Sequence, residues 1–452
     1  MGMDNDRPYW NMEVETKLNT PEMRELQMAK IKKLIRRLYD NAPFYRKQFD
    51  ALGVNPDKIN SFSDFGKSVS VFDKEGLRSM VAEFGGDLLA VLDQIMPVSV
   101  DDLSIMATTT GTTGIPTPYP MTWHDMVDLW GEAMVRGAWR AGMRSYDRVL
   151  CCFALSMVIA GIPTMMGMHR LGAMAIPVGA EAGTDRVLLM QTLFRGTVYS
   201  GTPSMAEYLI EKVRSQDKDP KDLGFRILMC GGEPGAGIPE VRQRLESAYG
   251  ARLFDVGAGF GFSCDHEEYQ GMHWTADDLA LYELVDPDTK QSIPLEDGAE
   301  GEALFTVLEG DGMAWLRTSL GDIQQVFTSP CPCGRTGLRY KVVGRTDDML
   351  KVKGAIVYPT MVEGIVGSFV PKVTGQFRIV LTEKPPRVVP PLKVKIERGA
   401  DLPADKLTEL EKEMKEAFHT RAKFTPEIIW AEAGELERST YKGQTFEKLY
   451  EQ

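Results

Sequence analysis

The sequence predicts an α/β protein with two domains. The large N-terminal domain is expected to combine helix-covered parallel sheets with a barrel-like β subdomain, and the small C-terminal domain to be α+β. A chain of 452 residues exceeds what one hydrophobic core usually holds. Between about residues 145 and 260, short apolar runs alternate with helical patterns, which is typical of parallel strands covered by helices. Between 280 and 345 the pattern becomes strand–turn–strand, which favours antiparallel pairing.

The N-terminal region is predicted to be helical. A first helix opens at Pro21, a residue favoured at the first helical position, with Asn19 or Thr20 as its cap. A break before Pro43 starts a second, shorter helix. The basic stretch Lys30–Arg37 carries apolar residues at helical spacing, so we interpret it as a solvated helix face rather than a membrane-binding segment.

The later elements follow in order along the chain. The expected strands are Arg148–Leu155, Ala173–Val178, Gly196–Ser200 and Arg226–Cys230, and the helices include Met205–Arg214 and Ile238–Tyr249. After Gly344 new strand and helix patterns begin, among them the charged helix Asp405–Lys423. Residues 1–345 are therefore expected to form the large domain and residues 346–452 the small one.

Composition excludes several classes of protein. Apolar residues make up 43% and charged residues 26% of the chain, as in ordinary globular proteins, so a disordered or fibrous protein is not expected. A formal charge of −12 argues against a nucleic-acid partner. No apolar run reaches the roughly 18–20 residues needed to span a bilayer, and the acidic N-terminus does not resemble a leader, so a cytoplasmic location is expected. Six cysteines are too few for a disulfide scaffold.

A Thr-rich loop at residues 108–117 is the most informative segment. It contains five threonines before a closing Ile-Pro-Thr, with glycines at positions 111 and 114. Glycines let backbone N–H groups approach an anion, and Thr hydroxyls add donors that can turn toward phosphate oxygens. The Gly-Lys-Ser/Thr of a Walker loop is absent. The loop is therefore predicted to hold a polyphosphate, with a surface turn or hairpin tip as the alternative.

Further motifs follow the Thr-rich loop in a fixed order. They are Gly201-Thr202-Pro203-Ser204, Gly231-Gly232-Glu233-Pro234, Phe260-Gly261-Phe262-Ser263, Gly321-Asp322, Gly344-Arg345-Thr346-Asp347 and Arg438-Ser439-Thr440-Tyr441-Lys442. Together this set resembles the adenylate-forming enzyme superfamily. Asn41-Ala42-Pro43-Phe44-Tyr45-Arg46 and Cys331-Pro332-Cys333-Gly334-Arg335-Thr336 are similar to signatures of its phenylacetate–CoA ligase branch. The resemblance extends from about residue 10 to about residue 450.

The resemblance implies roles for individual residues. Asp322 corresponds to the acid that binds ribose hydroxyls, and Arg345 to the arginine that meets ribose and phosphate. Asp347 is at the hinge position about which the small domain turns, and Lys442 matches the lysine near the acyl-adenylate. From the residues alone, the alternatives are that Asp322 caps a turn, that Arg345 forms a surface salt bridge and that Lys442 is solvated. The nucleotide-binding set implied is Thr109, Thr110, Gly111, Thr112, Thr113, Gly114, Gly232, Glu233, Pro234, Phe260, Gly261, Ser263, Asp322 and Arg345.

The expected function is therefore ATP-dependent ligation of a carboxylic acid, of an aromatic class, to coenzyme A through an acyl-adenylate. ATP, Mg²⁺ and coenzyme A are the implied cofactors and partners, and a homodimer is common in the family. The alternatives are an adenylating enzyme with a different acceptor and a nucleotide-binding protein without activity. The methionine-rich segment Met157–Met168 is either an acyl pocket or a buried helix, and His169 and Arg170 are candidates for the substrate carboxylate.

This chain departs from the family pattern at three positions. Ile115 stands where the family has Lys, and Tyr441 precedes Lys442 where the family has Gly. Cys264 takes the place of a Glu that helps bind magnesium, and a thiol is a poor ligand for that hard cation. Either Asp265 or Glu267 supplies the oxygen instead, or ATP and water hold the metal.

Cysteines and histidines also suggest a structural zinc site. Cys331 and Cys333 lie in one short hairpin, with His266 and His273 upstream. Two separated pairs of thiolate and imidazole ligands can bind Zn²⁺ and hold two segments together. The expected ligands are His266, His273, Cys331 and Cys333, with Cys264 as the substitute if one histidine points away. Free cysteines and ordinary surface histidines are the alternative.

Overall fold

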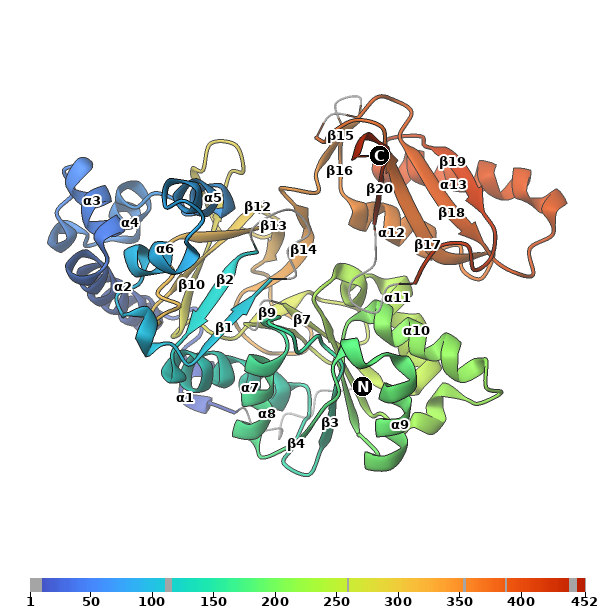
Figure 1. Ribbon diagram of the computed structural model, residues 1–452, viewed down its shortest axis with the longest axis horizontal. Helices are drawn as coiled ribbons and strands as arrows, with labels where there is room; N and C mark the ends of the chain where they lie inside the picture. Colours follow the sequence, from blue (N-terminus) through green and yellow to red (C-terminus); the bar gives the residue numbers. More distant parts are fainter. Residues whose placement is uncertain are drawn as a thin grey trace.

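The structure of the chain is a computed structural model that describes residues 10–109, 116–257, 260–352, 355–386, 388–438 and 445–451. A large sheet domain fills the centre and left of Figure 1, and the C-terminal strands and helices form a smaller unit above it at the right. None of the helices in these ranges is long and apolar enough to cross a membrane. The predicted combination of a large α/β domain with a smaller C-terminal α+β domain is confirmed.

Helices form the first part of the chain and cover one side of the large domain (Figure 1). They are α1 (Met12–Glu15), α2 (Pro21–Asn41), α3 (Pro43–Ala51), α4 (Phe62–Ser68), α5 (Lys74–Glu83) and α6 (Leu88–Ile95). The Thr20 hydroxyl accepts a hydrogen bond from the Met23 N–H at 3.3 Å, so α2 begins where the sequence predicts. Ile31, Ile35 and Leu38 are fully buried on one face of α2, as its apolar spacing requires.

Parallel strands form one half of the central sheet. They are β3 (Arg148–Cys151), β4 (Met174–Pro177), β5 (Val198–Gly201), β6 (Ile227–Gly231) and β7 (Arg252–Gly257), in the order β7-β6-β5-β3-β4. The helices of this half are α7 (Gly131–Arg140), α8 (Ile162–Leu171), α9 (Thr184–Phe194), α10 (Pro203–Arg214) and α11 (Pro239–Tyr249). A π-helical segment, Asp125–Trp130, leads into α7. The predicted alternation of strands and helices is confirmed.

The strands after β7 pair in antiparallel fashion, as expected for residues 280–345, and they continue the same sheet as the parallel strands. They are β8 (Gly261–Ser263), β9 (Met272–Trp274), β10 (Ala280–Val285), β11 (Ser292–Ile293), β12 (Glu300–Val307), β13 (Thr318–Phe327) and β14 (Arg339–Arg345). The order within the described residues is β11-β10-β12-β13-β14-β9-β8-β7, so the strand-rich part shares one twelve-stranded sheet with the parallel half. A separate hairpin of β1 (Ile105–Thr108) and β2 (Pro118–Met121) lies beside it.

The C-terminal unit has its own sheets and its own core. Its elements are β15 (Leu350–Val352), β16 (Ala355–Val357), α12 (Pro359–Gly367), β17 (Val373–Leu381), β18 (Lys393–Arg398), α13 (Leu407–Ala422), β19 (Glu427–Ala431) and β20 (Phe446–Lys448). The main sheet has the order β19-β18-β17-β20. Leu410, Met414 and Phe418 on α13 are buried in the core of this unit, which accounts for the charged, amphipathic helix expected there.

Candidate active site

The first group of predicted site residues lies at the carboxyl ends of the parallel strands. Gly201 ends β5 and is paired with Cys230 of β6, while Gly231 ends β6 and is paired with Val256 of β7. The chain leaves β3 toward β4, whereas β5 lies on the other side of β3. Ligands of open α/β sheets bind in the crevice that such a change of direction creates. The motifs that follow β5 and β6 are therefore positioned at a binding crevice by the topology.

Contacts between loops bring these motifs together. Gly232 has φ +82°, and a Cβ at this position would lie 3.7 Å from both Phe153 and Thr202, so the loops after β3, β5 and β6 meet here. The Ser204 N–H donates to Glu233 Oε1 at 2.7 Å. Pro234 then begins a short 3-10 turn, Pro234–Gly237. Glu233 thus ties the end of β6 to the start of α10, while Gly232 lets the backbone pass close to neighbouring side chains.

The Phe260–Ser263 motif forms the inner wall of this region. Phe260 is buried. The centroid of its ring lies 5.6 Å from the ring centroid of Trp130 and 5.4 Å from that of Trp274. A Cβ at Gly261 would lie 2.1 Å from Tyr340 Oη, so no larger residue fits. The Ser263 hydroxyl accepts a hydrogen bond from the Asp255 N–H at 2.9 Å. These side chains are engaged inside the sheet, which leaves the backbone as the part of the motif that can meet a ligand.

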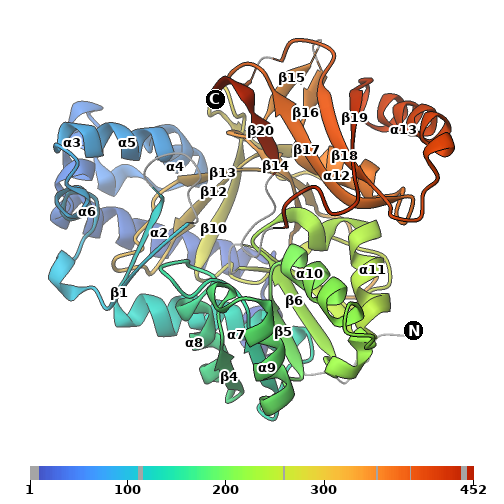
Figure 2. The same cartoon turned by 45° about the vertical axis from the view of Figure 1, so that its right-hand side comes forward.

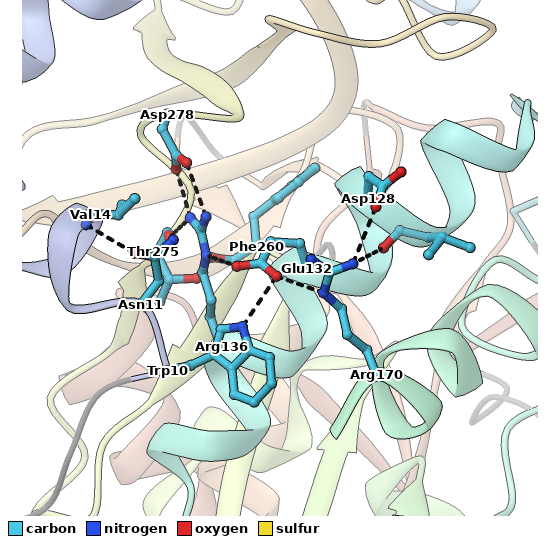
Figure 3. A network of polar contacts seen from close by, with 11 residues as sticks. Trp10, Asn11, Val14, Asp128, Glu132, Arg136, Arg170, Phe260, Thr275 and Asp278 are labelled. Carbon is cyan, nitrogen blue, oxygen red and sulfur yellow. Dashed lines mark hydrogen bonds and ion pairs between the residues drawn. The ribbon is translucent and has the colours of Figure 1, made fainter. Parts of the chain in front are cut away.

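A polar network supports this wall from behind (Figure 3). Arg136 on α7 binds Asp278 at 2.6 and 3.0 Å and donates to the Thr275 carbonyl at 3.1 Å. In turn, the Thr275 N–H donates to the Phe260 carbonyl at 3.1 Å. Glu132 accepts from Arg136, from Arg170 and from Trp10, which connects the N-terminal segment to α7. A fixed array of buried charges therefore positions the Phe260 backbone.

Arg170 takes part in that network and does not point to a free substrate site. Its guanidinium binds Glu132 at 2.8 Å and Asp128 at 3.2 Å (Figure 3). His169, the other candidate for the substrate carboxylate, is exposed on α8. Most of the methionine-rich segment is helix, and Met168 is buried in the core, as the alternative of a buried helix expects. Met157 instead lies exposed in the loop before α8.

The Thr-rich loop connects the two strands of the β1–β2 hairpin. At its base, the Thr109 N–H donates to the Thr117 carbonyl at 3.0 Å, and the Thr117 N–H donates to the Thr109 hydroxyl at 3.2 Å. Thr109 and Thr117 thus close the loop at its base. Its other predicted nucleotide-binding residues, Thr110, Gly111, Thr112, Thr113 and Gly114, lie outside the described residues, as does Ile115.

Asp322 and Arg345 are brought together by strand register. They are directly paired across β13 and β14, and the Arg345 guanidinium forms an ion pair with the Asp322 carboxylate. Arg345 also donates to the Leu320 carbonyl at 2.8 Å and to Asp347 at 3.0 Å. Gly321 has φ +86°, a conformation that favours glycine and permits this turn of the strand. A carboxylate and a guanidinium thus lie side by side where the chain leaves the large sheet.

Asp347, the predicted hinge residue, is held by two cations. Besides Arg345, Lys74 at the start of α5 donates to its carboxylate at 2.9 Å. Burial opposes ionisation of Asp347, but the two cations outweigh burial and lower its pKa to about 2. Sequence reasoning did not find Lys74, because a single lysine after a helix cap carries no motif. Lys442 lies outside the described residues, and the preceding Arg438 binds Glu397 at 2.7 Å.

Four potential metal ligands come together in one buried cluster. The ligand atoms of Cys264, His273, Cys331 and Cys333 all lie within 4.8 Å of one another. Cys264 Sγ lies 3.8 Å from Cys331 Sγ, and Cys333 Sγ lies 3.4 Å from His273 Nε2. A tetrahedral zinc ion with Zn–S of about 2.3 Å needs sulfurs about 3.8 Å apart, so these side chains fit that ion. Burial lowers the pKa of His273, which keeps its imidazole neutral and able to act as a ligand.

The structure corrects the expected ligand set in one member, because His266 lies outside the cluster. Its Nδ1 accepts a hydrogen bond from the Glu268 N–H at 3.2 Å, and Arg252 binds the carbonyls of Asp265 and His266. These contacts turn the imidazole away, and Cys264 takes its place. Asp265 and Glu267, the expected substitutes for the magnesium ligand, are exposed on this segment, and Asp265 pairs with Arg335 at 3.5 Å.

Comparison with known proteins assigns the family. The model for AMP-binding enzymes matches residues 30–306, and that for the AMP-binding enzyme C-terminal domain matches residues 354–447. The chain belongs to the AMP-binding enzyme family. A phenylacetate–coenzyme A ligase of Thermus thermophilus is 30% identical over 412 residues, which cover 88% of each chain. That of Escherichia coli is 28% identical over 358 residues, covering 77% of each. Within its family, this enzyme belongs with the phenylacetate–CoA ligase branch.

Two solved structures of a related ligase, in different states, differ in how closely they match the domain arrangement of this AMP-binding enzyme. A 2-hydroxyisobutyryl-CoA ligase in the postadenylation state, in complex with R3-HIB-AMP, is 25% identical with a TM-score of 0.87. The same ligase in the thioesterification state, with 2-HIB-AMP and CoA, has a TM-score of 0.69. Each comparison covers 99% of this chain and 94% of the other. The domain arrangement described here is therefore more similar to the postadenylation state.

Proposed function

We propose that this enzyme joins a carboxylic acid to coenzyme A in two steps. In the first, a carboxylate oxygen attacks the α-phosphorus of ATP and pyrophosphate leaves, which forms an acyl-adenylate. In the second, the thiol of coenzyme A loses its proton and attacks the acyl carbon, and AMP leaves with the carboxylate oxygen. The observation that carries this proposal is the Asp322–Arg345 pair at the end of the large sheet. The phenylacetate–CoA ligase relatives add the class of reaction.

Each residue has a proposed part in the first step. Asp322 accepts hydrogen bonds from the ribose hydroxyls, and Arg345 offers its planar fork to ribose and α-phosphate oxygens. Backbone groups of Gly232–Pro234 and Phe260–Gly261 line the nucleotide. Thr109–Gly114 hold the phosphates, and Lys442 stabilises charge on the transferring group. Mg²⁺ would neutralise charge on the β- and γ-phosphates when bound.

The domain boundary and hinge are part of the same proposal. Strands up to Arg345 belong to the large sheet, and those from Leu350 belong to the small unit. We place the boundary at residues 345–346 and the hinge at Asp347. Rotation there would withdraw Lys442 after the first step and admit coenzyme A for the second.

An aromatic acid is the proposed substrate class, and the relatives named phenylacetate–coenzyme A ligase support it. The test is pyrophosphate release from ATP and Mg²⁺ with phenylacetate, benzoate and 2-hydroxyisobutyrate, each with and without coenzyme A. The proposal expects release with an aryl acid, rising with coenzyme A, and a mass spectrum that contains the acyl-CoA. Pyrophosphate release without any thioester would indicate a different acceptor. If the protein binds ATP but releases no pyrophosphate with any of the acids, the proposal is contradicted.

A structural zinc ion is proposed at Cys264, His273, Cys331 and Cys333. It would join the end of β8, strand β9 and the turn between β13 and β14, and so stabilise the antiparallel half of the sheet. Purified, tag-free protein is expected to contain about one zinc per chain, and Cys333→Ser to lose zinc and unfold at a lower temperature. Cys230→Ser is the matched control, since Cys230 is buried on β6 away from the cluster. Wild-type protein with far less than one zinc per chain would contradict the site.

A cytoplasmic location is proposed from the state of the thiols. All six cysteines are free in the structure, as in proteins kept in a reducing compartment. Cell fractionation that finds the protein outside the cytoplasm would contradict it.

A further inference from the structure

The loop between β3 and α8 is anchored to the base of the Thr-rich loop. The Thr108 N–H donates to the Met157 carbonyl at 2.5 Å, and the Ile159 N–H donates to the Thr108 carbonyl at 3.0 Å. Thr108 is the last residue of β1, so the chain passes directly from this anchor into the Thr-rich loop. The position of residues 157–159 therefore fixes where that loop begins.

A single carboxylate holds the other side of the same loop. Glu181 lies in a short 3-10 segment between β4 and α9. Its Oε1 accepts three hydrogen bonds, from the Leu155 N–H at 2.8 Å, the Ser156 N–H at 2.7 Å and the Ser156 hydroxyl at 2.6 Å. Burial opposes ionisation of Glu181, but hydrogen bonds from Ser156 outweigh it and lower the pKa. The acceptor is therefore a charged carboxylate at neutral pH, and such hydrogen bonds are stronger than neutral ones.

Met157 lies between these two anchors in an unfavourable conformation. Its φ is +62°, in the left-handed region that side chains other than glycine seldom adopt. Such a conformation persists only where the surroundings fix it. The Met157 side chain is 57% exposed, so its own packing does not fix this conformation. The hydrogen bonds to Glu181 on one side and to Thr108 on the other fix it instead.

We infer that Glu181 is a positioning residue for acyl-adenylate formation: through Leu155 and Ser156 it holds residues 157–159, which hold the base of the Thr-rich loop. The inference rests on the proposed function, in which that loop binds the phosphates of ATP. Glu181 acts through the backbone and touches no substrate. Its loss should weaken the step that uses ATP and spare thioester formation from supplied acyl-AMP, because that step has no β- or γ-phosphate to hold.

The test compares three variants with the wild-type chain in both half-reactions. Glu181→Ala removes all three hydrogen bonds and is expected to raise KM for ATP, and the Kd of ATP measured by calorimetry, about tenfold, because the base of the phosphate loop is then less well positioned. Glu181→Gln keeps an uncharged acceptor and is expected to show a smaller rise. Asp185→Ala is the matched control, since this exposed carboxylate on α9 pairs with Lys212 at 3.0 Å and not with the loop.

Three results would overturn the inference. They are an unchanged ATP affinity in Glu181→Ala, an equal loss in both half-reactions together with a lower unfolding temperature, and a higher ATP affinity in Glu181→Gln. The last would show that the Glu181 charge merely repels ATP. If the wild-type chain binds ATP but forms neither acyl-AMP nor thioester, the proposed function fails, while the ATP affinities of the variants still decide the role of Glu181.

Discussion

Two contacts between the large and the small domain differ in their balance of charge. We call the first the strand junction, made of Asp322, Arg345, Asp347 and Lys74, and the second the helix junction, made of Glu207, Glu233, Glu363 and Arg244. The strand junction has two carboxylates and two cations, whereas the helix junction has three carboxylates and one cation. The helix junction lies where α12, which carries Glu363, packs against α11 and the 3-10 turn Pro234–Gly237 (Figures 1 and 2).

The difference in charge balance appears in the pKa of one carboxyl group from each junction. Asp347 is held by Arg345 and Lys74, which lower its pKa to about 2 in spite of its burial. Burial raises the pKa of Glu363 to about 8, and Glu233 and Glu207 add to the rise. A Cβ at Gly235 would lie only 3.5 Å from Glu363 Oε1, so this carboxyl packs closely against the 3-10 turn after Glu233. With these pKa values, Asp347 stays charged through neutral pH, whereas Glu363 takes up or releases a proton near pH 8.

Removing the cation at the centre of the strand junction should have the largest effect. Arg345→Ala leaves Asp322 and Asp347 without their shared partner and removes the proposed contact to ribose and phosphate. We expect acyl-AMP formation to fall about 100-fold or more, in the range seen for loss of a charge-stabilising donor. Arg345→Lys keeps the charge without the planar fork and should recover only part of the rate. Wild-type rates in Arg345→Ala would refute the assigned role of this junction.

The helix junction should make docking of the small domain depend on pH. Because the docked pKa of Glu363 is raised, its contribution to docking is fully present below about pH 4.5 and is lost as pH rises through about 8. Energy transfer between one fluorophore on α9 and another on α13 measures docking from pH 6 to 9. Glu363→Gln cannot ionise and should give a flatter profile. Other charged groups close to this junction are Glu211, Glu240, Arg421 and Arg438.

An equally steep profile in Glu363→Gln would assign the titration to another group. Glu240→Gln is the control for this measurement, because its carboxylate lies at the same interface but pairs with Arg421. Its profile should keep the wild-type midpoint.

The exposed ion pair at the edge of the helix junction should matter least. Arg421 Nη2 lies 3.5 Å from Glu240 Oε1, and the two side chains are 44% and 30% exposed. Exposed pairs of this kind contribute about 0.2–1 kcal/mol. Arg421→Ala should therefore change the rate of either half-reaction less than about fivefold. A loss of rate in Arg421→Ala as large as that in Arg345→Ala would contradict the difference proposed between the two junctions.

Local signals in the sequence predicted much of the fold. The start of α2 follows from Thr20 and Pro21, and the strands β3 to β6 follow from apolar runs set between helices. The continuity of the twelve-stranded sheet was not predictable, because it depends on pairings between distant segments such as β9 and β14. Sequence periodicity reports which face of a strand is buried but not which strand lies beside it.

The same limit applies to the site. Motifs pointed to Asp322 and Arg345, but only the register of β13 and β14 places one beside the other. Spacing alone could not decide between His266 and Cys264, which are two residues apart, since that choice depends on where the chain turns after β8. Lys74 and Glu181 act through contacts across long stretches of chain, and neither belongs to a recognisable motif.

If a carboxylate attacks the α-phosphorus of ATP to form an acyl-adenylate, one oxygen atom of the acid must end up in AMP. The most direct test uses an aryl acid labelled with ¹⁸O in its carboxyl group, together with ATP, Mg²⁺ and coenzyme A, and analyses the nucleotide product by mass spectrometry. AMP that carries one ¹⁸O atom from the acid is the expected product. Unlabelled AMP, or ADP in place of AMP, would contradict this mechanism.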